Sequence, residues 1–293
     1  MKQAIFKNWA ELVRFPNLFT VPGDILLGMA AVSSIADFSL GKYLYVLMIS
    51  LLLYAGGMIL NDVMDYDEDK KLRSKRVLPS GRISLDAAKI SVVVCFAIAA
   101  ILAHFSNQRV FVITIILILC VYFYDGPSRR IPQLGFVSMG ACRSLNILLG
   151  AVAISEVNTP ALVVALCEGA YIYAVCVIAH NETSKLPSQA WCKLPLTVIA
   201  TCLVIIIFST PLNIFSLVAA LFLLWSTFNI VKDLNNMLPV SKIPPNIGRL
   251  IRNLIPLQFC LAITVAPHWL YILLPLMVAI PLCAKSAKKV TMS

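Results

Sequence analysis

The chain is dominated by apolar stretches that are long enough to cross a lipid bilayer. A helix needs about 20 mainly apolar residues to span a hydrocarbon core about 30 Å thick. Candidate spans cover residues 15–36, 42–60, 88–105, 109–124, 132–153, 159–179, 193–210, 212–231, 250–266 and 268–284. Only 13% of the 293 residues are charged and 60% are hydrophobic, whereas about a quarter of a soluble domain is charged. The sequence therefore predicts an all-α polytopic membrane protein.

The number of spans is open at the C-terminal end. Pro256, Pro267, Pro275 and Pro281 interrupt the last two apolar stretches, and proline inside a helix kinks or breaks it. These stretches are therefore either two spans or one long broken helix. We expect nine to ten transmembrane helices in a single integral membrane domain over residues 1–293.

The distribution of basic residues predicts the orientation. With an inside N-terminus and an even number of spans, every lysine and arginine except Lys42, Arg109 and Arg143 falls at an inside end. Basic residues concentrate on the cytoplasmic side of membrane proteins. We therefore expect a multi-pass protein whose N-terminus is cytoplasmic, with residues 1–14 as an interfacial segment. Segments 61–87 and 180–192 would be cytoplasmic loops.

The net charge of +10 is explained by this orientation and by attraction to the head groups of membrane lipids. The sequence contains no soluble domain and no basic surface interleaved with aromatic residues, so nucleic acid is not expected as a partner. It identifies no protein partner either.

An acidic cluster follows the second apolar stretch, where residues 61–76 read NDVMDYDEDKKLRSKR. On a continuous helix, Asn61, Asp62, Asp65 and Asp69 fall within about 100° of one another. Carboxylate and amide oxygens suit Mg2+, particularly when the ion also binds substrate phosphates. The alternative is a solvated acidic helix end that the following basic residues balance.

Several motifs resemble one known family. The pattern NDxxDxxxD at residues 61–69 resembles the signature of the UbiA superfamily of intramembrane prenyltransferases, and residues 76–84 resemble its RPxxSGRIS stretch. Residues 14–17, 122–124 and 129–135 are also similar to the family. Residues 139–150 look most like its divergent EboC-like branch. The resemblance covers the first two thirds of the chain well.

The resemblance implies a UbiA-type bundle around a central cavity. It also implies Mg2+-dependent transfer of a prenyl group from an isoprenyl diphosphate to an aromatic or other small-molecule acceptor. The matching first-motif residues, Asn61, Asp62, Asp65 and Asp69, would hold Mg2+ and the diphosphate, and the three aspartates would be catalytic. Arg129 or Arg130 would contact the phosphates, unless both only follow the charge bias. Tyr122 and Tyr124 would face the prenyl cation or belong to an interfacial aromatic belt.

The second acidic motif of the family is altered. Where a DxxxD pattern is expected, residues 179–187 read AHNETSKLP. Glu182 is left as a candidate metal ligand and catalytic residue, and Asn181 as a substrate-binding residue. Because of this change, two alternatives to prenyl transfer stand: a UbiA-type terpene cyclase, and a non-catalytic membrane component that binds or transports a lipid or metabolite.

Three charged residues lie far from the ends of predicted spans: Asp24, Arg143 and Glu168. A charge at membrane depth is costly, so such residues are usually paired or functional. Arg143 either pairs with one of the two carboxylates across the bundle or faces the cavity with Asn146, which follows at i+3. In the second case both residues would bind substrate.

Overall fold

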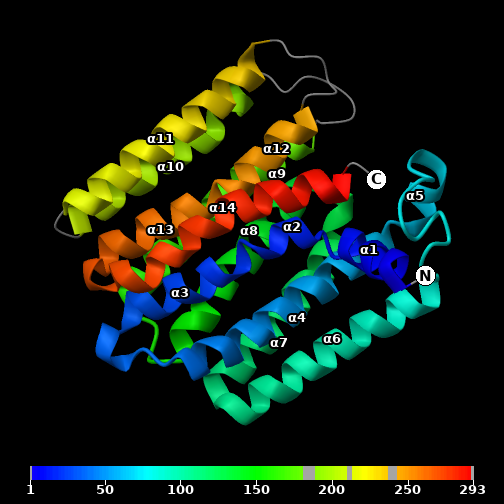
Figure 1. Ribbon diagram of the computed structural model, residues 1–293, viewed down its shortest axis with the longest axis horizontal. Coiled ribbons are helices and arrows are strands. Elements are labelled where there is room, and N and C mark those ends of the chain that lie inside the picture. The colour runs from blue at the N-terminus through cyan, green and yellow to red at the C-terminus, as the bar shows by residue number, and fades with distance from the viewer. Residues whose placement is uncertain (1, 181–188, 210–212, 237–242, 292–293) are drawn as a thin grey trace.

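The computed structural model describes residues 2–180, 189–209, 213–236 and 243–291, and all regular elements in these ranges are helical (Figure 1). The α-helices are α1 (Lys2–Leu12), α2 (Phe15–Leu18), α3 (Val21–Val32), α4 (Leu40–Met64), α5 (Tyr66–Leu72), α6 (Leu85–Ser106), α7 (Gln108–Asp125), α8 (Pro132–Val152), α9 (Thr159–Ala179), α10 (Gln189–Ser209), α11 (Ile214–Asn235), α12 (Ile243–Arg252), α13 (Leu254–Val265) and α14 (Leu270–Thr291). Short 3-10 helices cover Ile35–Asp37, Pro127–Arg130 and Pro267–Trp269. The predicted all-α class is confirmed.

Nine segments in the described ranges are long and apolar enough to cross a membrane, and a tenth apolar helix over Ala190–Ile206 is shorter. This agrees with the predicted nine to ten spans. The two C-terminal stretches are separate helices, because the chain turns at Pro267–Trp269 between α13 and α14. The broken-helix alternative is therefore wrong.

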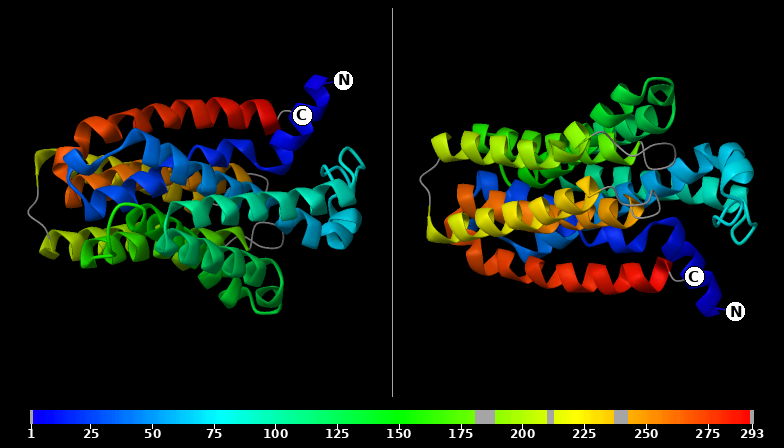
Figure 2. Two further views of the ribbon diagram at one scale, coloured as in Figure 1. Left: turned by 90° about the horizontal axis from the view of Figure 1, so that it is seen from below. Right: turned by 90° about the horizontal axis from the view of Figure 1, so that it is seen from above.

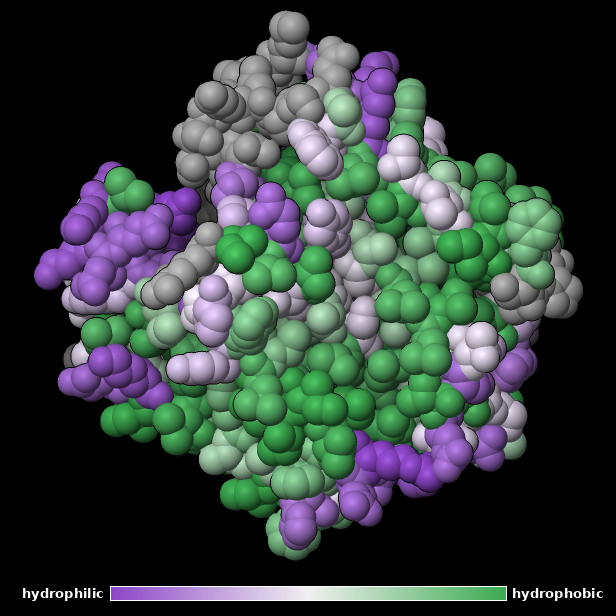
Figure 3. All heavy atoms as spheres, turned by 180° about the vertical axis from the view of Figure 1, so that it is seen from behind, coloured by the Kyte–Doolittle hydropathy of each residue, from purple (hydrophilic) through white to green (hydrophobic). Residues whose placement is uncertain are grey.

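The axes of the long helices are roughly aligned, so the bundle has two ends (Figure 2). We call the end that carries α5 and the C-terminal end of α4 the motif end. A broad hydrophobic surface separates the hydrophilic residues around α5 from others at the opposite corner of the molecule (Figure 3). This pattern suits a protein whose middle lies in hydrocarbon.

The N-terminal helix α1 lies at the motif end and is tied to the loop after α5. Arg82 donates two hydrogen bonds to the Glu11 carboxylate, at 2.6 and 2.8 Å. These hydrogen bonds raise the pKa of Arg82. A helix therefore occupies most of the N-terminal segment and is held beside the acidic motif.

Two glycines let α3 and α8 pack closely. A Cβ atom on Gly150 would lie 2.4 Å from the carbonyl oxygen of Ile25, and one on Gly28 would lie 1.9 Å from that of Ile147. Small residues at such crossings allow membrane helices to approach each other. Close approach of these two helices brings polar groups on α3 within reach of those on α8.

Candidate active site

The acidic motif lies at a short break between two helices. α4 ends at Met64, and Asp65 has a ψ of −2° before α5 begins, whereas a helical residue has a ψ of about −42°. The helix that the spacing predicts is therefore interrupted at Asp65. The motif side chains nevertheless stay close together. Arg76 contacts both Asp62 and Asp69, and Arg14 contacts both Asn61 and Asp62. Asn61 and Asp65 line a pocket at the motif end, whereas Asp69 is turned among arginines.

Two of the motif aspartates are neutralised by guanidinium groups. Arg76 donates to Asp69 at 2.6 Å and lies 3.8 Å from Asp62. Arg73 lies 3.7 Å from Asp69, and Arg14 lies 3.5 Å from Asp62. Asp69 is only 3% exposed. Its position indicates that it holds the loop after α5, because its carboxylate is already occupied by these cations.

Arg14 connects the start of the first span to the motif. Its backbone has a φ of 49° and a ψ of 53°, and no other non-glycine residue in the described ranges has a positive φ. The left-handed conformation costs about 1–2 kcal/mol for such a residue. It accompanies a turn between α1 and α2 from which the Arg14 guanidinium donates to Asn61 at 3.2 Å. Asn61 in turn donates to Asp125 at 2.8 Å.

An outer pocket of about 330 Å3 opens at the motif end. Its lining residues are Asn61, Asp65, Tyr124, Ser128, Pro132, Gly135, Phe136, Cys176, Ala179 and His180. The His180 ring lies 5.5 Å from that of Phe136, which places this histidine in the pocket wall. The outer pocket thus combines amide and carboxylate oxygens with hydroxyl and imidazole groups.

A second, inner cavity of about 80 Å3 lies between α3, α4, α7 and α8. Its apolar wall includes Leu53, Met58, Leu117, Val121 and Met139, and its polar wall includes Ser50, Asp24, Asp125, Arg143 and Asn146. Tyr124 lines both this cavity and the outer pocket. The two spaces therefore meet at a single tyrosine side chain.

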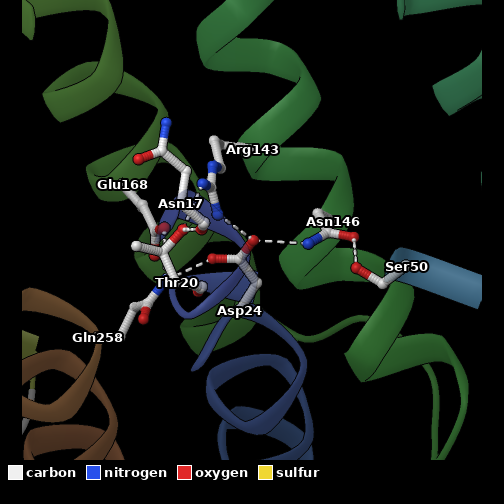
Figure 4. A network of polar contacts seen from close by, with 8 residues as sticks. All are labelled: Asn17, Thr20, Asp24, Ser50, Arg143, Asn146, Glu168 and Gln258. Carbon is white, nitrogen blue, oxygen red and sulfur yellow. Dashed lines mark hydrogen bonds and ion pairs between the residues drawn. The ribbon is translucent and has the colours of Figure 1, made fainter. Parts of the chain in front are cut away.

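The polar wall of the inner cavity belongs to a buried network centred on Asp24 (Figure 4). Asp24 accepts hydrogen bonds from Arg143 at 2.6 Å, from Asn146 at 2.5 Å and from Gln258 at 2.5 Å. Gln258 also donates to Glu168 at 2.9 Å. The predicted ion pair of Arg143 is confirmed with Asp24 as the partner, and the same arginine also lines the cavity.

Neighbouring groups fix Arg143 and Asn146 in place. Arg143 donates to the Thr20 hydroxyl at 2.7 Å and lies over the Tyr54 ring at 5.7 Å. Asn146 accepts from Ser50 at 2.7 Å. The network holds two carboxyl groups and one guanidinium, so it is electrically neutral when one carboxyl group carries a proton. A net buried charge would cost several kcal/mol at membrane depth.

The donor set at the motif end fits a magnesium ion that is shared with substrate phosphates. In the described ranges, no group of three His, Cys, Asp or Glu side chains is arranged to hold a metal by itself. Mg2+ usually binds through one or two carboxylates together with phosphates and water. Asn61 and Asp65 at the outer pocket meet that requirement. Asp62 Oδ1 accepts no hydrogen bond from the described residues, but it lies 3.5 Å from Arg14 and 3.8 Å from Arg76, so its charge is already balanced.

The remaining predicted site residues do not line the outer pocket or the inner cavity, or they lie outside the described residues. The Tyr122 side chain is exposed on the outside of α7, where it is 58% accessible, so it does not line either cavity. Arg129 and Arg130 end the short helix Pro127–Arg130, close to the outer pocket in sequence. Asn181 and Glu182 lie outside the described residues.

Some residues of the site were not predicted from the sequence. Gln258 reaches the network from α13, and Asp125 ends α7 and accepts from Asn61. Gln258 is a polar residue in an otherwise apolar stretch, which was the available signal. Asp125 had no comparable signal, because an acidic residue at the end of a span is ordinary.

The sequence and the fold were compared with those of known proteins. The sequence profile of the UbiA prenyltransferase family matches residues 24–237. The digeranylgeranylglyceryl phosphate synthase of Sulfurisphaera tokodaii is 28% identical over 150 residues, which cover 51% of this chain and 54% of that protein. The chain spans about half the length of the curated relatives it matches. Their names do not single out the EboC-like branch.

Solved structures show the same fold. A UbiA homologue from Aeropyrum pernix K1 has a TM-score of 0.67 at 14% identity, covering 82% of this chain and 94% of that one. A UbiA homologue from Archaeoglobus fulgidus bound to GPP and Mg2+ has a TM-score of 0.63 at 16% identity, covering 87% and 99%. The expected UbiA-type fold is thereby confirmed. The family profile matches more than half of the sequence, and the chain therefore belongs to the UbiA prenyltransferase family.

Proposed function

We propose that the protein transfers a prenyl group from an isoprenyl diphosphate to a small-molecule acceptor within the membrane, in a Mg2+-dependent reaction. The observation that carries this proposal is the meeting of a polar outer pocket and a largely apolar inner cavity at Tyr124. An isoprenyl diphosphate has the same division into a charged head and an apolar tail. The head would lie in the outer pocket and the tail in the inner cavity.

Each part of the site has a role in this reaction. Asn61 and Asp65 would hold Mg2+ and the diphosphate at the outer pocket, and Asp62, next to Asn61 in the chain, would add negative charge at the same end. Mg2+ bound there would neutralise the negative charge that develops on the leaving diphosphate. Arg14 and Arg76, which lie beside the motif aspartates, would add positive charge at the same end.

Tyr124 would stand next to the carbon at which the bond to the diphosphate breaks. Its ring can stabilise a prenyl cation through the negative face of the aromatic system. The apolar wall of the inner cavity would exclude water, which otherwise captures the cation. Arg129, Arg130, Asn181 and Glu182 remain candidates for phosphate or metal contacts on the strength of the family resemblance.

The polar wall of the inner cavity would bind the acceptor. Arg143 and Asn146 are held by Asp24 and present donors next to the cavity. The relatives are named synthases of digeranylgeranylglyceryl phosphate, so a glyceryl phosphate lipid belongs in the acceptor panel beside aromatic compounds. Residues 139–150 support membership of the EboC-like branch, and the distribution of basic residues supports a cytoplasmic motif end.

The test is release of diphosphate by the detergent-purified protein with isoprenyl diphosphates of several chain lengths, with Mg2+ or with a chelator. The critical variant is Asp65→Ala, and Asp67→Ala is its matched control because Asp67 is exposed in the same motif. We expect release that requires Mg2+ and Asp65 and that is retained in the control.

The acceptor panel separates the alternatives. Product joined to an added acceptor supports transfer, whereas Mg2+-dependent release with a cyclic product and no acceptor would make the protein a terpene cyclase. Binding of every isoprenyl diphosphate without release from any would refute the catalytic proposal and leave a non-catalytic lipid-binding component.

A further inference from the structure

A second amphipathic cavity lies away from α4 and α7, beside α13. Both α11 and α14 pack against α13 there (Figure 1). It consists of a polar pocket of about 220 Å3 and an apolar pocket of about 600 Å3. Phe222 and Pro256 line both pockets, so the two adjoin. We call the combined space the α11–α14 groove. It shares no lining residue with the outer pocket or the inner cavity.

The polar part of the groove is positively charged. It is lined by Arg249, Arg252, Ser226 and Asn253. Arg249 is paired with Asp233 and also donates to Asn246. Arg252 has no hydrogen-bond or ion-pair partner within the described ranges, although it is partly buried. The polar part therefore contains one guanidinium whose charge nothing described there balances.

The position of Arg252 makes this imbalance significant. It lies in the apolar segment Ile243–Val265, which is long enough to cross a membrane, and in the sequence it belongs to the basic residues near the inside end of a span. A long basic side chain near the end of a span extends to the lipid head groups, where it can pair with an anion. Ser226 and Asn253 hydrogen-bond each other at 2.8 Å beside it and add polar groups to the same wall.

The apolar part of the groove continues from Phe222 and Pro256 toward the opposite end of the bundle. Its lining includes Val218, Phe259, Leu274 and Met277. Val218 and Leu274 are exposed at 59% and 47%, so this part opens outward along two spans whose surroundings are hydrocarbon. A ligand that fills the whole groove must have an anionic head and long apolar chains.

We propose that the α11–α14 groove binds an anionic membrane phospholipid, whose phosphate contacts Arg252 and Arg249 and whose acyl chains lie over Phe222, Pro256 and Phe259. Basic pockets between membrane helices bind anionic head groups in this way. A free phosphate ion would use only the polar part, and a second copy of the chain would not require the unpaired arginine. The phospholipid accounts for both parts.

The experiment measures lipid binding and not turnover, so its result is independent of the proposed reaction. Thermal unfolding of the delipidated protein in detergent is followed with phosphatidylglycerol, with phosphatidylcholine of the same chains, and with inorganic phosphate. Native mass spectrometry counts the lipids retained. We expect phosphatidylglycerol to raise the Tm by several degrees more than phosphatidylcholine does, and inorganic phosphate to have no effect.

Four variants locate the site. Arg252→Gln should abolish the preference for phosphatidylglycerol, and Arg252→Lys should keep part of it, which separates loss of charge from misfolding. Val218→Trp leaves every charge in place and fills the apolar part, so it should weaken lipid retention. Lys89→Gln is the charge-matched control, because Lys89 is exposed on α6 away from the groove, and it should behave like the wild type.

Three outcomes would overturn the proposal. The first is equal stabilisation by the two phospholipids, and the second is a phosphatidylglycerol effect that survives Arg252→Gln. The third is stabilisation by inorganic phosphate that Val218→Trp does not change, which would make the site a phosphate site without a lipid.

Discussion

Removing the charge of Arg143 is expected to destabilise the bundle strongly. Arg143 and Asp24 are 9% and 0% exposed, and they are joined by a hydrogen bond of 2.6 Å. Arg143→Gln would leave Asp24 and Glu168 buried without a cation. Breaking a buried ion pair by removing one partner costs about 3–5 kcal/mol. At about 2 °C per kcal/mol for a chain of this size, the Tm would fall by about 6–10 °C.

The assay is thermal unfolding of the purified protein in detergent, followed by intrinsic fluorescence. Arg109→Gln is the matched control, because the pair between Arg109 and Glu156 is exposed and such pairs contribute about 0.2–1 kcal/mol. The double variant Asp24→Asn/Arg143→Gln should lose less stability than the sum of the single variants, with a coupling of about 1–3 kcal/mol. A Tm for Arg143→Gln close to that of the control, or additive single effects, would refute the reasoning.

Three further predictions follow from the same geometry. Tyr124→Ala should lower kcat/KM for diphosphate release by about tenfold, whereas Tyr122→Ala, on the exposed face of α7, should change it by less than about twofold. Equal effects of the two variants would contradict the position of Tyr124 between the outer pocket and the inner cavity. Gly150→Ala should destabilise by about 1–3 kcal/mol because it forces α3 from α8, while Gly41→Ala, where a Cβ meets only a side-chain atom at 3.8 Å, should not; similar Tm values would be inconsistent with close packing. Asp69→Asn should lower the Tm and leave the Mg2+ concentration for half-maximal activity within about twofold, and a large increase in that concentration would show that its carboxylate binds the metal.

The membrane spans were predictable because the physical requirement is local. A spanning helix needs a sufficient run of apolar residues, and prolines and capping residues mark where it starts. The predicted span 159–179 coincides with α9, whose first turn is capped by Asn158. The predicted span 132–153 differs from α8 only at its last residue. In both cases the signal lies within the segment itself.

The facing of the acidic motif was less predictable. The spacing of Asn61, Asp65 and Asp69 gives their relative positions only for a continuous helix, and the chain turns at Asp65. The turn places Asp69 against Arg76, seven residues further on. Helical periodicity describes one unbroken helix, so it cannot report which carboxylates a following basic loop will neutralise.

Contacts between distant helices were the least accessible part. The sequence indicated that Arg143 needs a partner and offered two, because charges at membrane depth are costly. It could not choose Asp24, which lies 119 residues away and is brought close by the packing of α3 on α8. Gln258 joins the same carboxylate from α13, 234 residues from Asp24.

The most direct test of the proposed function is a structure of the protein with a non-hydrolysable isoprenyl thiolodiphosphate and Mn2+ in place of Mg2+. The metal would be located by its anomalous scattering. We predict the metal and the diphosphate in the outer pocket in contact with Asp65, and the prenyl chain passing Tyr124 into the inner cavity. A metal that avoids Asn61 and Asp65, or a prenyl chain that lies in the α11–α14 groove instead of the inner cavity, would contradict the proposal.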